Sequence, residues 1–269
     1  YKTLTANIIR SNSNIHLANG EYTLDKKKDI SNVNFIGSDP EKTIIKFNGY
    51  GFNIQSTIFL QNLTLTDLAI INNYRLSATN TIFTQSTGSS IDYYGNNFGG
   101  AIYTPLNNYY ATLVNLTNCT FKDNYAEYGG AIYLESGNLY LNDCKFINNT
   151  AHNYGGAIFV DNTTSLIIIT TSFTNSKANL TAGAVYSLLN KLNRGNSIKD
   201  MSLGNTFENN TASSKQDAYE SDLIELNIGN GDYVLYYVNT TEITIIPSKY
   251  SLIDENNNPI AGKEIVFEL

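Results

Sequence analysis

The sequence predicts an all-β protein: a right-handed, single-stranded parallel β-helix with a C-terminal β extension. Three observations lead to this fold class. A Gly-Gly-Ala-Ile segment recurs every 26 to 30 residues, a Phe-x-x-Asn segment recurs between its copies, and short stretches of alternating apolar and polar residues precede both. A unit of this size cannot bury its apolar face alone, whereas stacked units bury a continuous core.

The two repeated elements define the coil. The Gly-Gly element occupies segments 98–103, 128–133, 154–159 and, in a variant form, 181–186. The Phe element occupies segments 121–124, 146–149, 173–176 and 207–210. Apolar and polar residues alternate around both elements with the period of two that is typical of strands. One repeat is therefore interpreted as three short strands joined by turns.

Stacking such coils in register places equivalent residues on top of each other. Phe121, Phe146 and Phe173 are expected to form an internal aromatic stack. The Ile or Val of each Gly-Gly element forms a second internal row or points outward, depending on the register. Asn tolerates left-handed backbone conformations, and stacked Asn side chains can bond between coils. The expected members of this ladder are Asn124, Asn149 and Asn210.

The chain is divided into three parts by this pattern. Residues 1–14 are expected to cap the solenoid, because Leu4, Ile8 and Ile9 have helical spacing and an open β edge needs a cover. Residues 15–242 are the predicted parallel β-helix, with an irregular last coil over 223–238. Residues 243–269 form a strand tail or part of a second module.

Composition limits the function classes. The net charge is −7 and the pI is near 4.8, which argues against nucleic acid as a partner. The hydrophobic fraction of 42% is enough for a sizeable core. No apolar run reaches the roughly 18 residues that span a bilayer. A signal peptide is not visible at Tyr1, as expected for a mature or trimmed secreted chain.

The repeats resemble a known family. Gly-Gly-Ala-Ile paired with Phe-x-x-Asn is similar to the repeat signature of the polymorphic outer membrane proteins of chlamydiae, and equally to the adhesin-like surface proteins of methanogenic archaea. Both belong to the pectin-lyase-like β-helix group. The stretch 15–24 resembles the opening coil of the archaeal proteins. The resemblance covers residues 10–212 and implies the fold more specifically than the function.

The tail resembles a different module. Residues 244–247 followed by 252–267 look like the first two strands of a bacterial immunoglobulin-like module, which follows the β-helix in the archaeal proteins. Two strands do not make a stable sandwich. The alternatives are a truncated module or a strand pair that joins another chain or an adjacent module. This tail and the glycosylation sequons favour the archaeal family over the chlamydial one.

Catalysis is not expected. Polysaccharide lyases and hydrolases of this fold need clustered Asp with Arg, Lys or His. The three arginines, Arg10, Arg75 and Arg194, are far apart in sequence, and His152 is expected in a solvated turn. The oxygen-rich stretches 229–232 and 254–258 are interpreted as turns rather than calcium sites. We therefore expect neither an enzyme, a metal site nor a cofactor.

The two cysteines, Cys119 and Cys144, lie 25 residues apart at the same position of the repeat. They are expected to be adjacent in the stack, at a separation that a disulfide can span. Cross-links between directly stacked parallel neighbours are strained, and Cys is often a small buried residue. Free buried thiols are the preferred interpretation.

Candidate contact residues lie in insertions and sequons. The coil from Phe83 to Phe121 is longer than the others, and loops on a rigid solenoid are where binding is usually placed. Its tyrosines either bind a partner or pack the loops down: Tyr93, Tyr94, Tyr109 and Tyr110. Eight Asn-X-Thr sequons are candidate glycosylation sites: Asn62, Asn115, Asn118, Asn148, Asn162, Asn179, Asn209 and Asn239.

These patterns predict a non-enzymatic, extracellular, adhesin-like cell-surface protein that attaches to cells, glycans or host polymers. Its partner would be a glycan or a surface protein of another cell. The first alternative is a structural subunit of an extracellular fibre or surface layer, with copies joined through the C-terminal strands. The second alternative is a polysaccharide lyase or hydrolase.

Overall fold

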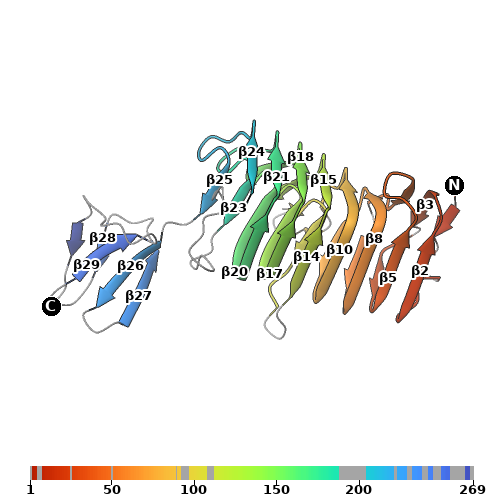
Figure 1. Cartoon of the computed structure of the whole chain (residues 1–269), viewed down its shortest axis with the longest axis horizontal. Helices are drawn as coiled ribbons and strands as arrows, with labels where there is room; N and C mark the ends of the chain where they lie inside the picture. Colours follow the sequence, from red (N-terminus) through yellow and green to blue (C-terminus); the bar gives the residue numbers. More distant parts are fainter. Residues whose placement is uncertain are drawn as a thin grey trace.

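A computed structural model describes residues 2–4, 8–24, 26–49, 51–88, 90–91, 97–107, 112–187 and 204–220, together with five later strands that end at residue 266. Twenty of the described strands join in one large sheet, and their pairings are parallel. Successive coils lie side by side along the chain (Figure 1). The predicted parallel β-helix is therefore confirmed.

Three columns of strands form the walls of the coil. The first column contains β2 (Ser13–Leu17), β5 (Val33–Gly37), β8 (Thr57–Thr66), β10 (Arg75–Thr84), β14 (Leu113–Thr117), β17 (Ile132–Asn142) and β20 (Ile158–Ile169). The second contains β1 (Lys2–Leu4), β3 (Gly20–Leu24), β6 (Thr43–Lys46), the ends of β8 and β10, β15 (Thr120–Lys122), β18 (Lys145–Ile147), β21 (Ser172–Thr174) and β24 (Thr206–Glu208).

The third column contains β4 (Lys28–Ile30), β7 (Gly51–Ile54), β9 (Ala69–Asn72), β13 (Ile102–Thr104), the starts of β17 and β20, β23 (Val185–Ser187) and β25 (Ala218–Glu220). A separate five-stranded sheet lies between the second and third columns in sequence and contains β11 (Ser90–Ile91), β12 (Asn97–Phe98), β16 (Tyr125–Tyr128), β19 (Thr150–Tyr154) and β22 (Lys177–Ala178). This sheet leads each coil into its Gly-Gly corner.

The interior of the coil is apolar, and its centre is a stack of phenylalanines. Phe121 lies 4.8 Å from Phe146, and Phe146 lies 4.9 Å from Phe173, measured between ring centroids. The stack continues to Phe83 at one end and to Phe207 at the other. The predicted stack is confirmed, and it extends over five coils because Phe recurs at an inward position of the same column.

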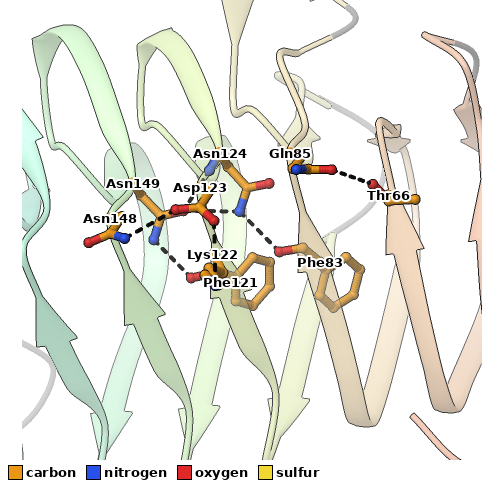
Figure 2. Close-up of polar contacts among 9 residues, drawn as sticks. All are labelled: Thr66, Phe83, Gln85, Phe121, Lys122, Asp123, Asn124, Asn148 and Asn149. Atoms are coloured by element: carbon orange, nitrogen blue, oxygen red, sulfur yellow. Dashed lines mark hydrogen bonds and ion pairs between the residues drawn. The ribbon is translucent and has the colours of Figure 1, made fainter. Parts of the chain in front are cut away.

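The Phe-x-x-Asn corner is held by buried asparagine side chains (Figure 2). Asn124 donates to the backbone carbonyl of Phe83 at 3.1 Å and to Oδ1 of Asn149 at 2.9 Å. Asn149 in turn donates to the carbonyl of Phe121 at 3.0 Å. The predicted ladder is present between Asn124 and Asn149, whereas Asn210 accepts from the N–H of Ser176 and donates to the carbonyl of Phe173. The left-handed backbone, however, belongs to the preceding residues, with φ of 55° at Asp123 and 53° at Asn148.

The Gly-Gly corner is made by close backbone contact. A Cβ atom added to Gly130 would lie 2.2 Å from the carbonyl oxygen of Gly156 in the next coil, a distance that no side chain tolerates. After this corner, Ile132 and Ile158 are fully buried. The open question of the register is thereby settled, since the Ile of each element points inward.

The ends of the chain differ from the sequence-based expectation. Residues 2–4 form strand β1 and pair with β3, so this part of the expected helical cap is a strand. The sequence predicts an irregular last coil over 223–238, but β26 (Leu223–Ile228) and β27 (Asp232–Tyr237) pair antiparallel with each other, and β26 also pairs antiparallel with β29 (Tyr250–Asp254). β28 (Glu242–Thr244) pairs parallel with β30 (Glu264–Val266).

Candidate functional site: an outer aromatic stripe

The residue after each inward Ile or Val of the Gly-Gly element is aromatic, and the alternation of a strand turns it to the opposite, outer face of the wall. Register pairs Tyr103 with Tyr133, Tyr133 with Phe159, and Phe159 with Tyr186. Their ring centroids are 5.6, 4.8 and 5.0 Å apart in that order. Four consecutive coils thus present a row of aromatic rings on the third wall.

A second aromatic row flanks the first, from the residues that precede each Gly-Gly pair. Phe98, Tyr128 and Tyr154 lie in neighbouring coils, with centroid distances of 5.8 and 6.0 Å along the row. Across the rows, Phe98 stacks on Tyr133 at 5.0 Å. These seven residues are called the outer aromatic stripe: Phe98, Tyr103, Tyr128, Tyr133, Tyr154, Phe159 and Tyr186.

The stripe is only partly covered. Tyr133 and Phe159, in its middle, are 8% and 7% exposed, because the flanking row packs against them. The other five members are half-buried. The stripe is therefore a surface made of packed rings, in which a ligand would meet ring edges and phenol groups more than open ring faces.

Two carboxylates lie beside the stripe. Glu135 and Asp161 follow Tyr133 and Phe159 by two residues on β17 and β20. Glu135 accepts hydrogen bonds from the Tyr103 hydroxyl and from the backbone N–H of Leu106. Partial burial, followed by the charge of Glu135, raises the pKa of Asp161. Burial and the same two carboxylates raise the pKa of Tyr133.

No basic side chain compensates this pair among the residues that the structure describes. The ion pairs found there join Lys42 to Asp39, Lys46 to Glu21 and Lys122 to Asp123. None includes Glu135 or Asp161, so the stripe is locally acidic.

The tyrosines predicted as contact residues, Tyr93, Tyr94, Tyr109 and Tyr110, lie outside the described residues. Sequence reasoning missed the outer aromatic stripe. The signal was available in the sequence, since the last residue of all four Gly-Gly elements is Tyr or Phe. It lies three residues after the second glycine and next to an aliphatic residue that points inward.

Four of the sequon asparagines have positive φ: Asn62, which lies within β8, and Asn118, Asn148 and Asn209, which follow strands at corners. Asn118 donates to Oδ1 of Asn80, and Asn148 donates to Oδ1 of Asp123, so these amides already bond between coils. Asn115 lies on the outer face of β14, and Asn179 follows β22; both are exposed. Asn162 lies on β20, and Asn239 lies outside the described residues.

The two cysteines are neighbours in the interior. Both are 1% exposed and present as free thiols. Cys119 contacts the carbonyl of Ala78, and Cys144 contacts that of Leu116. The bond from the N–H of Lys145 to the carbonyl of Cys119 ties their coils together at 2.8 Å. Mutual hydrogen bonding of the thiols raises the pKa of Cys119 and lowers that of Cys144.

Other candidate chemistry is sparse in the described part of the chain. His152 lies on β19 rather than in a turn; it is exposed, and its Nδ1 is 3.4 Å from Nδ2 of Asn179. Across the described ranges, no group of three or more His, Cys, Asp or Glu residues is placed to hold a metal ion. Nor do those ranges contain a helix with the length and hydrophobicity needed to cross a membrane.

Comparison with known proteins finds one family. Residues 118–135 and 143–161 match the Chlamydia polymorphic membrane protein repeat. Each matched segment spans one Phe-x-x-Asn corner, one Gly-Gly corner and one carboxylate of the stripe. No curated protein and no solved structure matches the chain.

Proposed function

We propose that this chain is a non-enzymatic, adhesin-like surface protein, in which the β-helix is a rigid stalk and the outer aromatic stripe is the contact surface. The match of two coils to the Chlamydia polymorphic membrane protein repeat carries this proposal, because that repeat is described as one of membrane proteins. The parallel β-helix supports it, since stacked coils present an extended, rigid surface.

The stripe is preferred as the contact surface for a physical reason. The fully buried phenylalanines of the coil, such as Phe121 and Phe146, point inward and hold the core. The rings of the stripe lie on the outer face, where tyrosine supplies broad apolar area and a polar group to a partner.

Two measurements test the proposed function. Antibody labelling and protease treatment of intact producing cells should detect the chain at the surface, and beads coated with the purified chain should bind target cells above albumin-coated beads. Exclusively intracellular labelling, or beads that bind no better than albumin, would refute the adhesin-like role. The fibre alternative predicts a ladder of multimers on size exclusion that disappears when residues 243–269 are deleted.

A further inference from the structure

The only two cysteines of the chain are direct neighbours in the stack of coils. Cys119 and Cys144 lie 25 residues apart, just before β15 and β18, and the next residues, Thr120 and Lys145, pair in register. The backbone N–H of Lys145 donates to the carbonyl of Cys119 at 2.8 Å. In-register neighbours lie roughly 4.8 Å apart, which is inside the range of about 4.4–6.8 Å between the Cα atoms of a disulfide. The backbone therefore already has the spacing that a cross-link needs.

The flanking coils show what the fold itself requires at this position. Thr81 and Thr171 occupy it there, one coil before Cys119 and one coil after Cys144. Each threonine hydroxyl donates to the backbone carbonyl two residues earlier, at 3.0 and 2.9 Å. Each cysteine sulfur lies 3.4 Å from the equivalent carbonyl. A small hydrogen-bonding side chain is therefore sufficient here, and what the two cysteines add is the ability of sulfur to form a covalent bond.

The two thiols contact each other just beneath the surface. The Cys119 thiol donates a hydrogen bond to the Cys144 sulfur, and both side chains are 1% exposed. Each cysteine directly follows an exposed turn residue with positive φ, Asn118 or Asp143, so local opening of one turn would expose it. The hydrogen bond from Cys119 lowers the pKa of Cys144, so Cys144 is the thiol that ionises and reacts first.

We propose that Cys119 and Cys144 are a site of covalent modification: in an oxidising environment they form an intrachain disulfide that ties two adjacent coils together. The structure holds the pair in its reduced form, as free thiols. Both sulfurs turn toward a carbonyl of their own coil, so bond formation requires one side chain to rotate about its Cα–Cβ bond. This inference goes beyond the adhesin-like function and does not depend on it.

The oxidant is a small disulfide, and the reaction is thiol–disulfide exchange in two steps. The thiolate of Cys144 attacks one sulfur of the small disulfide, which forms a mixed disulfide and releases one small thiolate. Cys119 then loses its proton and attacks the Cys144 sulfur, which expels the second small thiolate. The two protons from the cysteines end on the two small thiols. Two protein thiols are oxidised and one small disulfide is reduced, so no further reactant is needed.

The test follows this bond in the full 269-residue chain. The reduced chain is incubated in its folded form, and in parallel refolded from urea, with equal concentrations of oxidised and reduced glutathione. Free thiols are then blocked with N-ethylmaleimide, and the intact and digested chains are analysed by mass spectrometry. Most molecules should carry a disulfide between Cys119 and Cys144 in at least one of the two preparations. Two blocked thiols, or glutathione adducts without an internal disulfide, in both preparations would overturn the inference.

Two double variants assign the bond to stacked neighbours. Cys119→Ser with Thr171→Cys moves the thiol pair by one coil, to positions 144 and 171, and should cross-link as the unaltered chain does. Cys144→Ser with Thr171→Cys is the matched control, because it leaves thiols at positions 119 and 171, two coils or roughly 9.6 Å apart, beyond the reach of a disulfide. This control should keep both thiols. Equal cross-linking of the two variants would show that the bond forms without stacking and would also overturn the inference.

A bond that ties coils together should also make the chain harder to unfold. It closes a loop of 25 residues and restricts the unfolded chain, so the oxidised chain should have a higher urea midpoint than the same chain after reduction. The variant Cys119→Ser, Cys144→Ser keeps hydroxyls at both positions and should have the same midpoint in oxidising and reducing buffer. An oxidised midpoint at or below the reduced one would mean that the bond strains the coil, and would overturn its role as a tie.

Discussion

The two corners of the coil both turn the chain between strands and hold adjacent coils together, one through side chains and the other through backbone alone. At the Phe-x-x-Asn corner, buried side-chain amides bond to backbone groups of the adjacent coil. The amide of Asn149 accepts from the backbone N–H of Asn124 and donates to the backbone carbonyl of Phe121. At the Gly-Gly corner, side chains are absent, and Gly130 lets backbone of adjacent coils touch. The first corner turns its aromatic residues inward, while the second is flanked by aromatic residues on the outer face. One corner therefore builds the core, whereas the other builds a surface.

The largest expected effect on stability comes from truncating an inner ring, and truncating an outer ring provides the comparison. Phe146→Ala should lower the free energy of unfolding by about 3–5 kcal/mol, because it opens a cavity in a fully buried stack. Phe159→Ala, in the outer stripe, should cost roughly 1.5–3 kcal/mol, since this ring, although only 7% exposed, lies on the outer face, where water can fill its site. Urea denaturation of both variants measures the difference; equal losses would contradict the division into core and surface.

The second glycine of the Gly-Gly corner should tolerate no side chain, whereas the first is already replaced by Ala182 in the fourth copy. Gly130→Ala is expected to destabilise by about 3 kcal/mol, because its Cβ meets backbone atoms of Gly156 and Thr150 that cannot move separately. Gly49→Asn is the control: this glycine has a φ of 77°, which Asn tolerates, and nothing lies within 4 Å of the added atom. The control should lose less than about 1 kcal/mol in the same urea titration.

The stability of the Phe-x-x-Asn corner should depend on the buried amide of Asn149 rather than on Asn148, the preceding residue with positive φ. Asn149→Leu keeps the volume but takes the acceptor from the N–H of Asn124, so we expect a loss of roughly 2–3 kcal/mol. Asn148→Gly retains the positive φ and removes only exposed contacts, and should change stability by less than about 1 kcal/mol. Thermal unfolding of the two variants is sufficient; the reverse order would mean that backbone conformation dominates this corner.

The smallest effect concerns charge at the outer stripe. Because the pKa of Asp161 is raised, the folded protein holds its proton more readily than the unfolded chain, and ionised Asp161 costs stability at neutral pH. This cost should fade as the pH drops through the raised pKa and below the ordinary value of 3.8. Asp161→Asn should therefore raise the urea midpoint slightly at pH 7 and leave it unchanged near pH 3. A larger gain at low pH than at pH 7 would contradict the cause assigned here.

Much of the coil could be predicted because its repeats are local. The period between Phe121, Phe146 and Phe173 predicts stacking whatever the detailed backbone, since only stacked coils bury them all. The outer stripe could not be recognised so easily. Whether Tyr133 points inward or outward depends on a register shift of one residue, and that shift moves every side chain to the opposite face.

Residue type and period are enough to predict that the chain stacks into a parallel β-helix, that Phe121 and its equivalents form the core, and that Asn124 and Asn149 bond between coils. Three features could be read only from the folded chain: the face that each Gly-Gly element shows to solvent, the proximity of Glu135 and Asp161 beside it, and the separate sheet of β26 and β27. Contact between coils brings together residues whose sequence spacing does not show which side of the wall they face.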